Sequence, residues 1–206
     1  MRILRYFGAI ALIFIPIGSF SEPLQDIQSA AKAAFARMPD VRVVPQIKGE
    51  CGADDSVTDL AAYCTSSNEI LVQAGQSEAA ATYGVAHAYG HAVQVRHGVA
   101  DIALREIRAR RAEEPTLRGY VDRQVDCIAG FLVAAAGLGP MSLADIFKDD
   151  PFDDIHWGRD PLRVGPVMPV SLADRDVWFA KGQAGDIADC AVGEFGSELL
   201  VIAYQG

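Results

Sequence analysis

Cationic side chains are scarce in this 206-residue sequence, which has 18 Lys and Arg residues against 27 Asp and Glu residues. A surface that binds nucleic acid needs clustered cations. The basic cluster at residues 105–111 is interleaved with glutamate, and Glu106 and Arg110 have the spacing of an ion pair on a solvated helix face. The composition therefore argues against a nucleic-acid partner.

A hydrophobic run that could span a bilayer, about 20 residues, is also lacking. The apolar stretch 7–17 is shorter, follows two arginines and precedes the pattern Ser19-Phe20-Ser21, which is typical of a secretory signal peptide. We predict a signal peptide over residues 1–21 and a single domain over residues 22–206, exported to the periplasm or the cell exterior. No stable membrane span is expected after cleavage, and the charge without the leader arginines is 16 − 27 = −11. The alternative is an uncleaved leader that acts as an anchor.

The sequence has no C-x-x-C pair, which weakens the case for a zinc–cysteine site. Its four cysteines allow three pairings, and export favours disulfides over thiols. Cys51 and Cys64 are close enough in sequence to join a short loop, which leaves Cys127 and Cys190 to tie a helix to the C-terminal segment. Buried free thiols are the alternative.

The hydrophobic pattern predicts an α+β domain that is mostly helical and has a small sheet. Ser77 and Gly98 frame the most apolar helix, Asp101 is a candidate cap for the next one, and Pro115 breaks the chain before a third. Helices are expected over residues 23–37, 78–97, 101–114, 116–136 and 174–181, and strands within residues 41–47 and 69–73.

Two of the four histidines, His87 and His91, lie four residues apart on the predicted helix 78–97. That helix is apolar nearly all round and should be buried. At about 100° per residue the two side chains project only about 40° apart, so both can contact one metal ion. Zinc sites of the H-E-x-x-H type have a glutamate after the first histidine, but here that residue is Ala88. Two core histidines satisfied by hydrogen bonds are the alternative.

Two longer segments, one of which contains both histidines, resemble motifs of a known family. They read T-Y-G-V-A-H-A-Y-G-H-A-V-Q at residues 82–94 and D-R-Q-V-D-C-I-A-G at residues 122–130. The first resembles the zinc helix of the neutral zinc metallopeptidases of bacteria, approximately A-Y-V-I-A-H-E-V-G-H-H-V-Q, and the second resembles that family's E-L-Q-A-D-C-F-A-G. Further similarities, including the run that begins at Arg175, extend the resemblance over residues 51–195 and imply a zincin-like fold.

The resemblance implies a zinc cofactor held by His87, His91 and Asp122. The family has glutamate at the position of Asp122, whose side chain is one methylene shorter, so the helices must approach more closely or the site is looser. Asp126, one turn later on the same face, is placed to accept a hydrogen bond from a ligating histidine. The alternative for both carboxylates is a helix N-terminal pair favoured by the helix dipole.

Ala88 changes the chemistry that the resemblance implies, because hydrolysis at zinc needs a base that takes a proton from water and delivers it to the departing nitrogen. A positioned acid/base group commonly contributes about 10²- to 10⁴-fold in rate. Glu78, Glu106 or Asp126 could replace it only if folding brings one of them to the metal. We therefore expect a degenerate peptidase homologue that keeps zinc and a peptide or protein segment as ligands, with little proteolysis.

Two other functions stay open: an active zinc peptidase with a replacement base, and a metal-free interaction domain held by two disulfides. The resemblance also implies that strand 69–73 borders a cleft that accepts an extended peptide by strand addition. His97 has the spacing of the third histidine in longer zinc motifs. Gln94 stands where those motifs have a helix-ending glycine, however, so a continuous helix would turn His97 about 120° away from His91.

Overall fold

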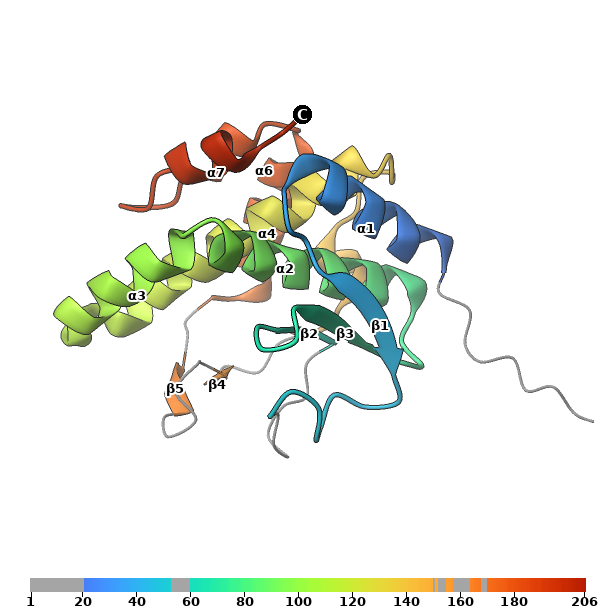
Figure 1. Cartoon of the computed structure of the whole chain (residues 1–206), viewed down its shortest axis with the longest axis horizontal. Helices are drawn as coiled ribbons and strands as arrows, with labels where there is room; N and C mark the ends of the chain where they lie inside the picture. The colour runs from blue at the N-terminus through green and yellow to red at the C-terminus, as the bar shows by residue number, and fades with distance from the viewer. Residues whose placement is uncertain (1–20, 53–59, 150, 152–154, 158–163, 168–169) are drawn as a thin grey trace, which may run out of the picture.

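Helices dominate the computed structural model of the chain, which describes residues 21–52, 60–149, 151, 155–157, 164–167 and 170–206 (Figure 1). They are α1 (Glu22–Ala34), α2 (Glu78–Arg96), α3 (Val99–Ala109), α4 (Glu114–Ala135), α5 (Leu143–Ile146), α6 (Leu172–Gln183) and α7 (Glu198–Ala203), with 3₁₀ turns η1 (Arg111–Glu113) and η2 (Ile187–Cys190). Residues 1–20 of the predicted leader lie outside the described residues. In the described part, no helix is long and apolar enough to cross a membrane. The mostly helical α+β prediction is confirmed.

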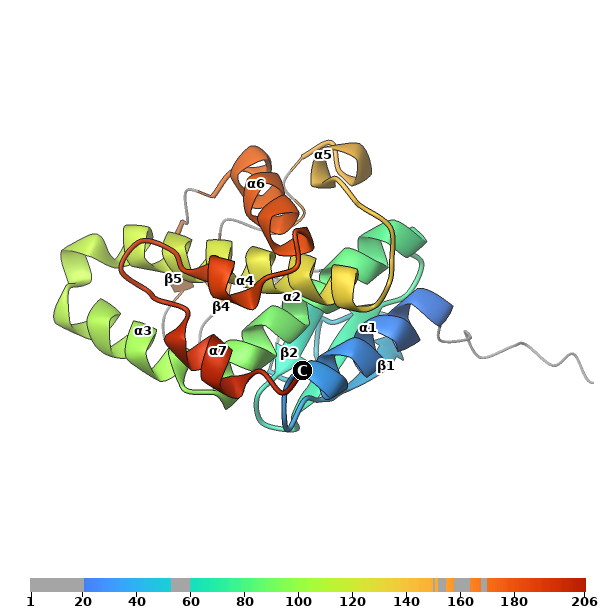
Figure 2. The same cartoon turned by 90° about the horizontal axis from the view of Figure 1, so that it is seen from above.

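Helix α2 lies at the centre of the fold, between the three-stranded sheet and α4 (Figures 1 and 2). It begins where predicted, because the Ser77 hydroxyl accepts a hydrogen bond from the backbone N–H of Ala80 at 3.2 Å. It ends before Gly98, whose φ of +85° is the left-handed conformation that glycine adopts readily. Its side chains are buried in nearly every direction, as its apolar sequence predicts.

The sheet has the order β1-β3-β2, with β1 (Asp40–Val44) parallel and β2 (Ala61–Cys64) antiparallel to β3 (Glu69–Gln73). Strand β1 ends before Pro45 at an edge of this sheet, where a proline costs least. Strand β3 is central and is paired on both sides, so a peptide that adds as a strand cannot pair with β3 itself. The cleft that the resemblance implies beside this strand stays a prediction. A second, two-stranded sheet joins β4 (Ile155–Trp157) to β5 (Val164–Val167).

Two predicted helix boundaries are corrected by the structure. Helix α3 begins at Val99, so Asp101 lies in its first turn and is not its cap. Pro115 lies within the first turn of α4 and does not separate two helices, because the missing N–H of a proline there has no intrahelical partner to lose. The break falls instead at Arg110, where α3 ends.

Both predicted disulfides are present. Cys51 is joined to Cys64, and Cys127 of α4 is joined to Cys190 of η2. The second pair is fully buried and connects residues 63 apart in sequence, so it fixes the C-terminal segment against α4.

Helices α4 and α6 cross at two glycines. A Cβ atom added to Gly130 would lie 2.0 Å from the carbonyl oxygen of Phe179, and one added to Gly182 would lie 1.8 Å from that of Cys127. Both obstacles are backbone atoms, so neither can turn aside. The two glycines therefore allow a backbone approach that any larger residue would prevent, and this approach brings the first turn of α6 to the middle of α4.

We expect Gly182→Ala to destabilise the protein by about 2 kcal/mol or more. In an exposed helix interior, alanine is more stabilising than glycine by roughly 1 kcal/mol. Overpacking a core, however, commonly costs about 1–3 kcal/mol, and here the added Cβ atom would clash with backbone atoms. Urea unfolding measures the difference. Gly139→Ala is the control, because a Cβ there meets nothing within 4 Å, and its stability should stay within about 0.5 kcal/mol of the parent protein. Equal stability of the two variants would contradict the close crossing.

Candidate metal centre

The two histidines predicted to bind metal lie on the same face of α2. The ring centroids of His87 and His91 are 4.9 Å apart, and the ring planes are nearly perpendicular, at 77°. His87 is buried and His91 is partly buried. The imidazole pair that the four-residue spacing predicts is therefore formed.

Asp126 of α4 orients the first imidazole. Its Oδ1 lies 2.8 Å from Nδ1 of His87 and also accepts a hydrogen bond from the Tyr83 hydroxyl at 2.8 Å. A carboxylate can only accept, so Nδ1 of His87 carries the proton and Nε2 is the unprotonated ring nitrogen. The predicted contact between Asp126 and a histidine of α2 is present, and it is the arrangement that orients metal-binding histidines in proteins.

Arg175 of α6 reaches the same place from the opposite side. Its Nη1 donates to Oδ2 of Asp126 at 3.1 Å, and its Nη2 donates to Oδ2 of Asp122 at 3.2 Å. All three side chains are buried, with 4%, 0% and 5% of their surface exposed. Sequence reasoning assigned no role to Arg175. The available signal was the spacing of Asp122 and Asp126, because two buried carboxylates one helical turn apart require a cation.

Asp122 is therefore paired with a cation of the chain itself. In the part of the chain that the structure describes, no three or more His, Cys, Asp or Glu side chains are grouped so that they could hold a metal ion. The two imidazoles suit zinc, but the third predicted ligand gives one oxygen to Arg175. The assignment of Asp122 as a metal ligand stays a prediction.

Burial sets the protonation of this cluster. Desolvation, with a smaller contribution from Arg175, lowers the pKa of His87 to about 3, and desolvation followed by repulsion from His87 lowers the pKa of His91 to about 4. Burial raises the pKa of Asp126 to about 6, against the opposing effect of Arg175. Both imidazoles are neutral at pH 7, which is the form that binds metal.

None of the three candidates for a replacement base is placed to act on water at this centre. Both oxygens of Asp126 are engaged, by His87 and Tyr83 on one side and by Arg175 on the other. Glu78 is the first residue of α2, nine residues and about 13 Å along the helix from His87. Glu106 lies on α3 and forms the predicted surface pair with Arg110. Ala88 itself is buried in the hydrophobic core.

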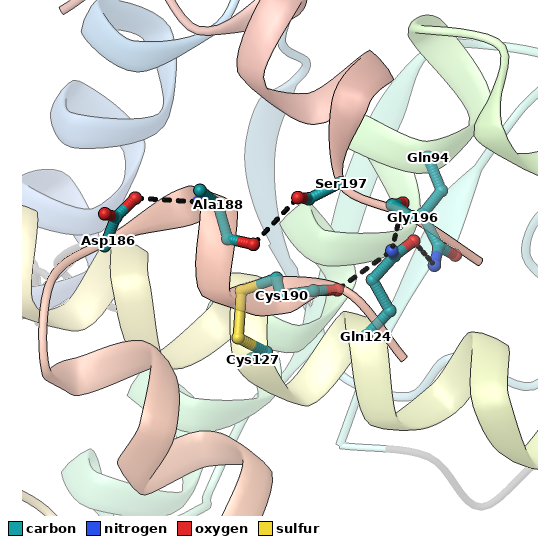
Figure 3. The surroundings of a disulfide bond; sticks show 8 residues. All are labelled: Gln94, Gln124, Cys127, Asp186, Ala188, Cys190, Gly196 and Ser197. Atoms are coloured by element: carbon teal, nitrogen blue, oxygen red, sulfur yellow. Dashed lines mark hydrogen bonds between the residues drawn. A yellow bond between two sulfur atoms is a disulfide. The ribbon is translucent and has the colours of Figure 1, made fainter. Parts of the chain in front are cut away.

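A buried amide pair holds α2 and α4 together beside the second disulfide (Figure 3). The Gln94 amide donates to Oε1 of Gln124 and to the carbonyl oxygen of Val121, each at 3.1 Å, and Gln124 donates to the carbonyl oxygen of Cys190 at 3.0 Å. Gln94 is therefore a structural residue within a continuous helix. His97, which has the spacing of a third histidine, forms the C-terminal cap of α2 and packs against Phe35, with ring centroids 5.9 Å apart and ring planes tilted by 46°.

Comparison with known families agrees with this geometry. The model of one family, described as "Putative neutral zinc metallopeptidase", matches residues 47–155, which are 109 of the 206 residues. The chain belongs to this family. The matched part of this zinc metallopeptidase homologue contains α2 and most of the sheet, together with α4, but it ends before α6 and Arg175. No curated protein and no solved structure matches the chain.

We expect the metal-free protein to lose stability as the pH falls from about 6 to about 4. His87 and His91 take up protons near pH 6.5 when unfolded but only near pH 3 and 4 when folded, so acid favours unfolding. Asp126 opposes this, because its pKa of about 6 in the folded protein exceeds the ordinary 3.8. Between these pH values the unfolded chain binds about one proton more than the folded protein, because two extra protons on the histidines are offset by one on Asp126. The free energy of unfolding therefore changes by about 1.4 kcal/mol per pH unit.

Urea unfolding at each pH with a chelator present measures this slope. His91→Gln removes one of the two opposing histidines, so its slope should be shallower than that of the parent protein by about 1.4 kcal/mol per pH unit. The same slope in both proteins would contradict the assigned protonation of His91.

Proposed function

We propose that this protein is an exported pseudo-peptidase: a neutral zinc metallopeptidase homologue that binds zinc and a peptide or protein segment but hydrolyses peptides poorly. The observation that carries the proposal is Ala88. It stands beside His87 on the family's metal-binding helix, in the position of the general base, and it has no group that can move a proton.

The residues that would hold zinc are His87 and His91, with Asp122 as the third ligand once its carboxylate is shared with the metal. When bound, zinc would lower the pKa of a bound water to about 7. The chain's own contribution is orientation, because the contact between Asp126 and Nδ1 fixes the ring of His87 and makes Nε2 the nitrogen that would bind the metal. Both imidazoles are neutral at pH 7, so metal binding need not displace protons from them.

Loss of the base is sufficient to make peptide hydrolysis slow. A positioned acid/base group commonly contributes about 10²- to 10⁴-fold, and Asp126, the nearest carboxylate of α4 to His87, has both oxygens engaged. Peptide binding does not need this group and is part of the proposal, although not by strand addition at the doubly paired β3.

Two observations are compatible with export. Both pairs of cysteines form disulfides, which persist mainly in oxidising compartments. The described helices include none that could cross a membrane.

We expect the zinc-loaded protein to cleave an unstructured protein substrate no faster than its His87→Ala variant. The reason is that zinc at this centre has no partner to transfer the proton. Gel analysis of a long incubation with an unfolded, reduced protein, with and without chelator, is the measurement. Zinc-dependent cleavage that His87→Ala abolishes would show an active peptidase with another base.

Ala88→Glu, with Ala88→Gln as an uncharged control of similar size, tests the rest of the machinery. Ala88 is buried, so both variants must first be shown to be folded by circular dichroism. Cleavage by the glutamate variant alone would show that only the base has been lost. No cleavage by either would place a second defect at Asp122 or in the peptide-binding surface.

A metal-free interaction domain is the second candidate function. It is favoured by the pairing of Asp122 with Arg175, which satisfies both groups with no metal. Metal analysis after gentle purification at pH 7.5, where the imidazoles are neutral, separates the two candidates. About one zinc per chain supports the first, and none after incubation with excess zinc supports the second.

A further inference from the structure

We infer that Arg175 is a built-in cation that holds the centre assembled without metal and competes with zinc for Asp122. The inference rests on the part of the proposed function that assigns zinc to this centre. It adds a residue outside the segment matched by the family model, and it concerns the strength of metal binding.

Arg175 joins the two carboxylates of α4 directly. One guanidinium bridges two carboxylates of α4 by two hydrogen bonds, Nη1 to Asp126 at 3.1 Å and Nη2 to Asp122 at 3.2 Å. Charge-assisted hydrogen bonds of this kind are strong, and a buried carboxylate left without its cation is costly. The two acidic side chains therefore keep a fixed arrangement beside the imidazoles when no metal is bound.

Arg175 and a bound zinc ion would compete for the carboxylate of Asp122. A zinc ligand must bring an oxygen to about 2.0–2.2 Å from the metal, and the metal's double positive charge repels a guanidinium bound to the same carboxylate. Asp126 keeps its own hold on Arg175, so the guanidinium stays beside Asp122 when the metal arrives. Zinc binding through Asp122 must therefore weaken an existing ion pair.

Helix α6, which carries Arg175, is held firmly in place. The helix is held against α4 by the close backbone approach at Gly130 and Gly182, and Arg123 of α4 pairs with Asp174 at 3.2 Å. Its start is capped by Ser171, whose hydroxyl accepts from the backbone N–H of Asp174. With its helix fixed in this way, Arg175 has little freedom to withdraw from the carboxylates.

The test compares the zinc affinity of the full mature chain with those of Arg175→Met and Arg175→Lys, by competition with a chromophoric chelator at pH 7.5. Arg123→Met is the matched control, because Arg123 also joins α4 to α6 through an ion pair but does not contact the carboxylates of the centre. We expect Arg175→Met to bind zinc at least tenfold more tightly than the parent protein, Arg175→Lys to fall between them, and Arg123→Met to match the parent.

A second measurement tests whether Arg175 stabilises the metal-free protein. The melting temperature of metal-free Arg175→Met should fall well below that of Arg123→Met, and zinc should raise it more than it raises that of the parent. If Arg175→Met folds only when zinc is present, that result also supports the inference. If it folds under neither condition, Arg175→Lys decides, because an ammonium is a point charge that cannot span both carboxylates as the guanidinium does.

Equal or weaker zinc binding by Arg175 variants that are folded without metal would overturn the inference while leaving the zinc binding of the parent protein intact. Absence of zinc binding by every variant would overturn both the inference and the zinc assignment in the proposed function. Peptide cleavage by the parent protein would contradict the pseudo-peptidase proposal alone, because cleavage does not depend on whether the parent protein or the Arg175 variants bind zinc more tightly.

Discussion

The close approach of α4 and α6 is the constraint on which the centre depends. Gly130 and Gly182 let the two backbones meet, and this contact places Arg175 between Asp122 and Asp126. Asp126 in turn fixes the ring of His87 on α2. A single helix crossing thus determines the geometry of side chains from three helices, and it pairs the buried charges of Asp122, Asp126 and Arg175 with one another.

Local signals in the sequence predict the parts of the fold that depend on neighbouring residues. The cap at Ser77, the stop at Gly98 and the even distribution of apolar residues between them correctly give the central helix and its burial. Of the three pairings that the four cysteines allow, the structure has the one in which the close pair Cys51 and Cys64 forms a short loop. The prediction that Pro115 breaks the chain was wrong, because proline disrupts a helix interior but fits well in the first turn of a helix.

Contacts between distant segments could not be read in this way. Arg175 is 49 residues from Asp126 and 53 from Asp122, and no periodic pattern connects them. The central position of β3 depends on its parallel pairing with β1, which places Asp40 opposite Glu69 although β2 lies between the two strands in the sequence. The contact of Asp126 with His87 was predictable only because the family resemblance placed both segments at one centre.

The buried bond between Cys127 and Cys190 has a consequence for how the molecule responds to proteolysis. The bond closes a loop that contains α5, both strands of the second sheet and α6. A protease that cuts the chain anywhere inside this loop produces two fragments that remain covalently joined. A nicked molecule would therefore keep its N-terminal and C-terminal parts together until a reductant reached sulfur atoms that solvent does not touch.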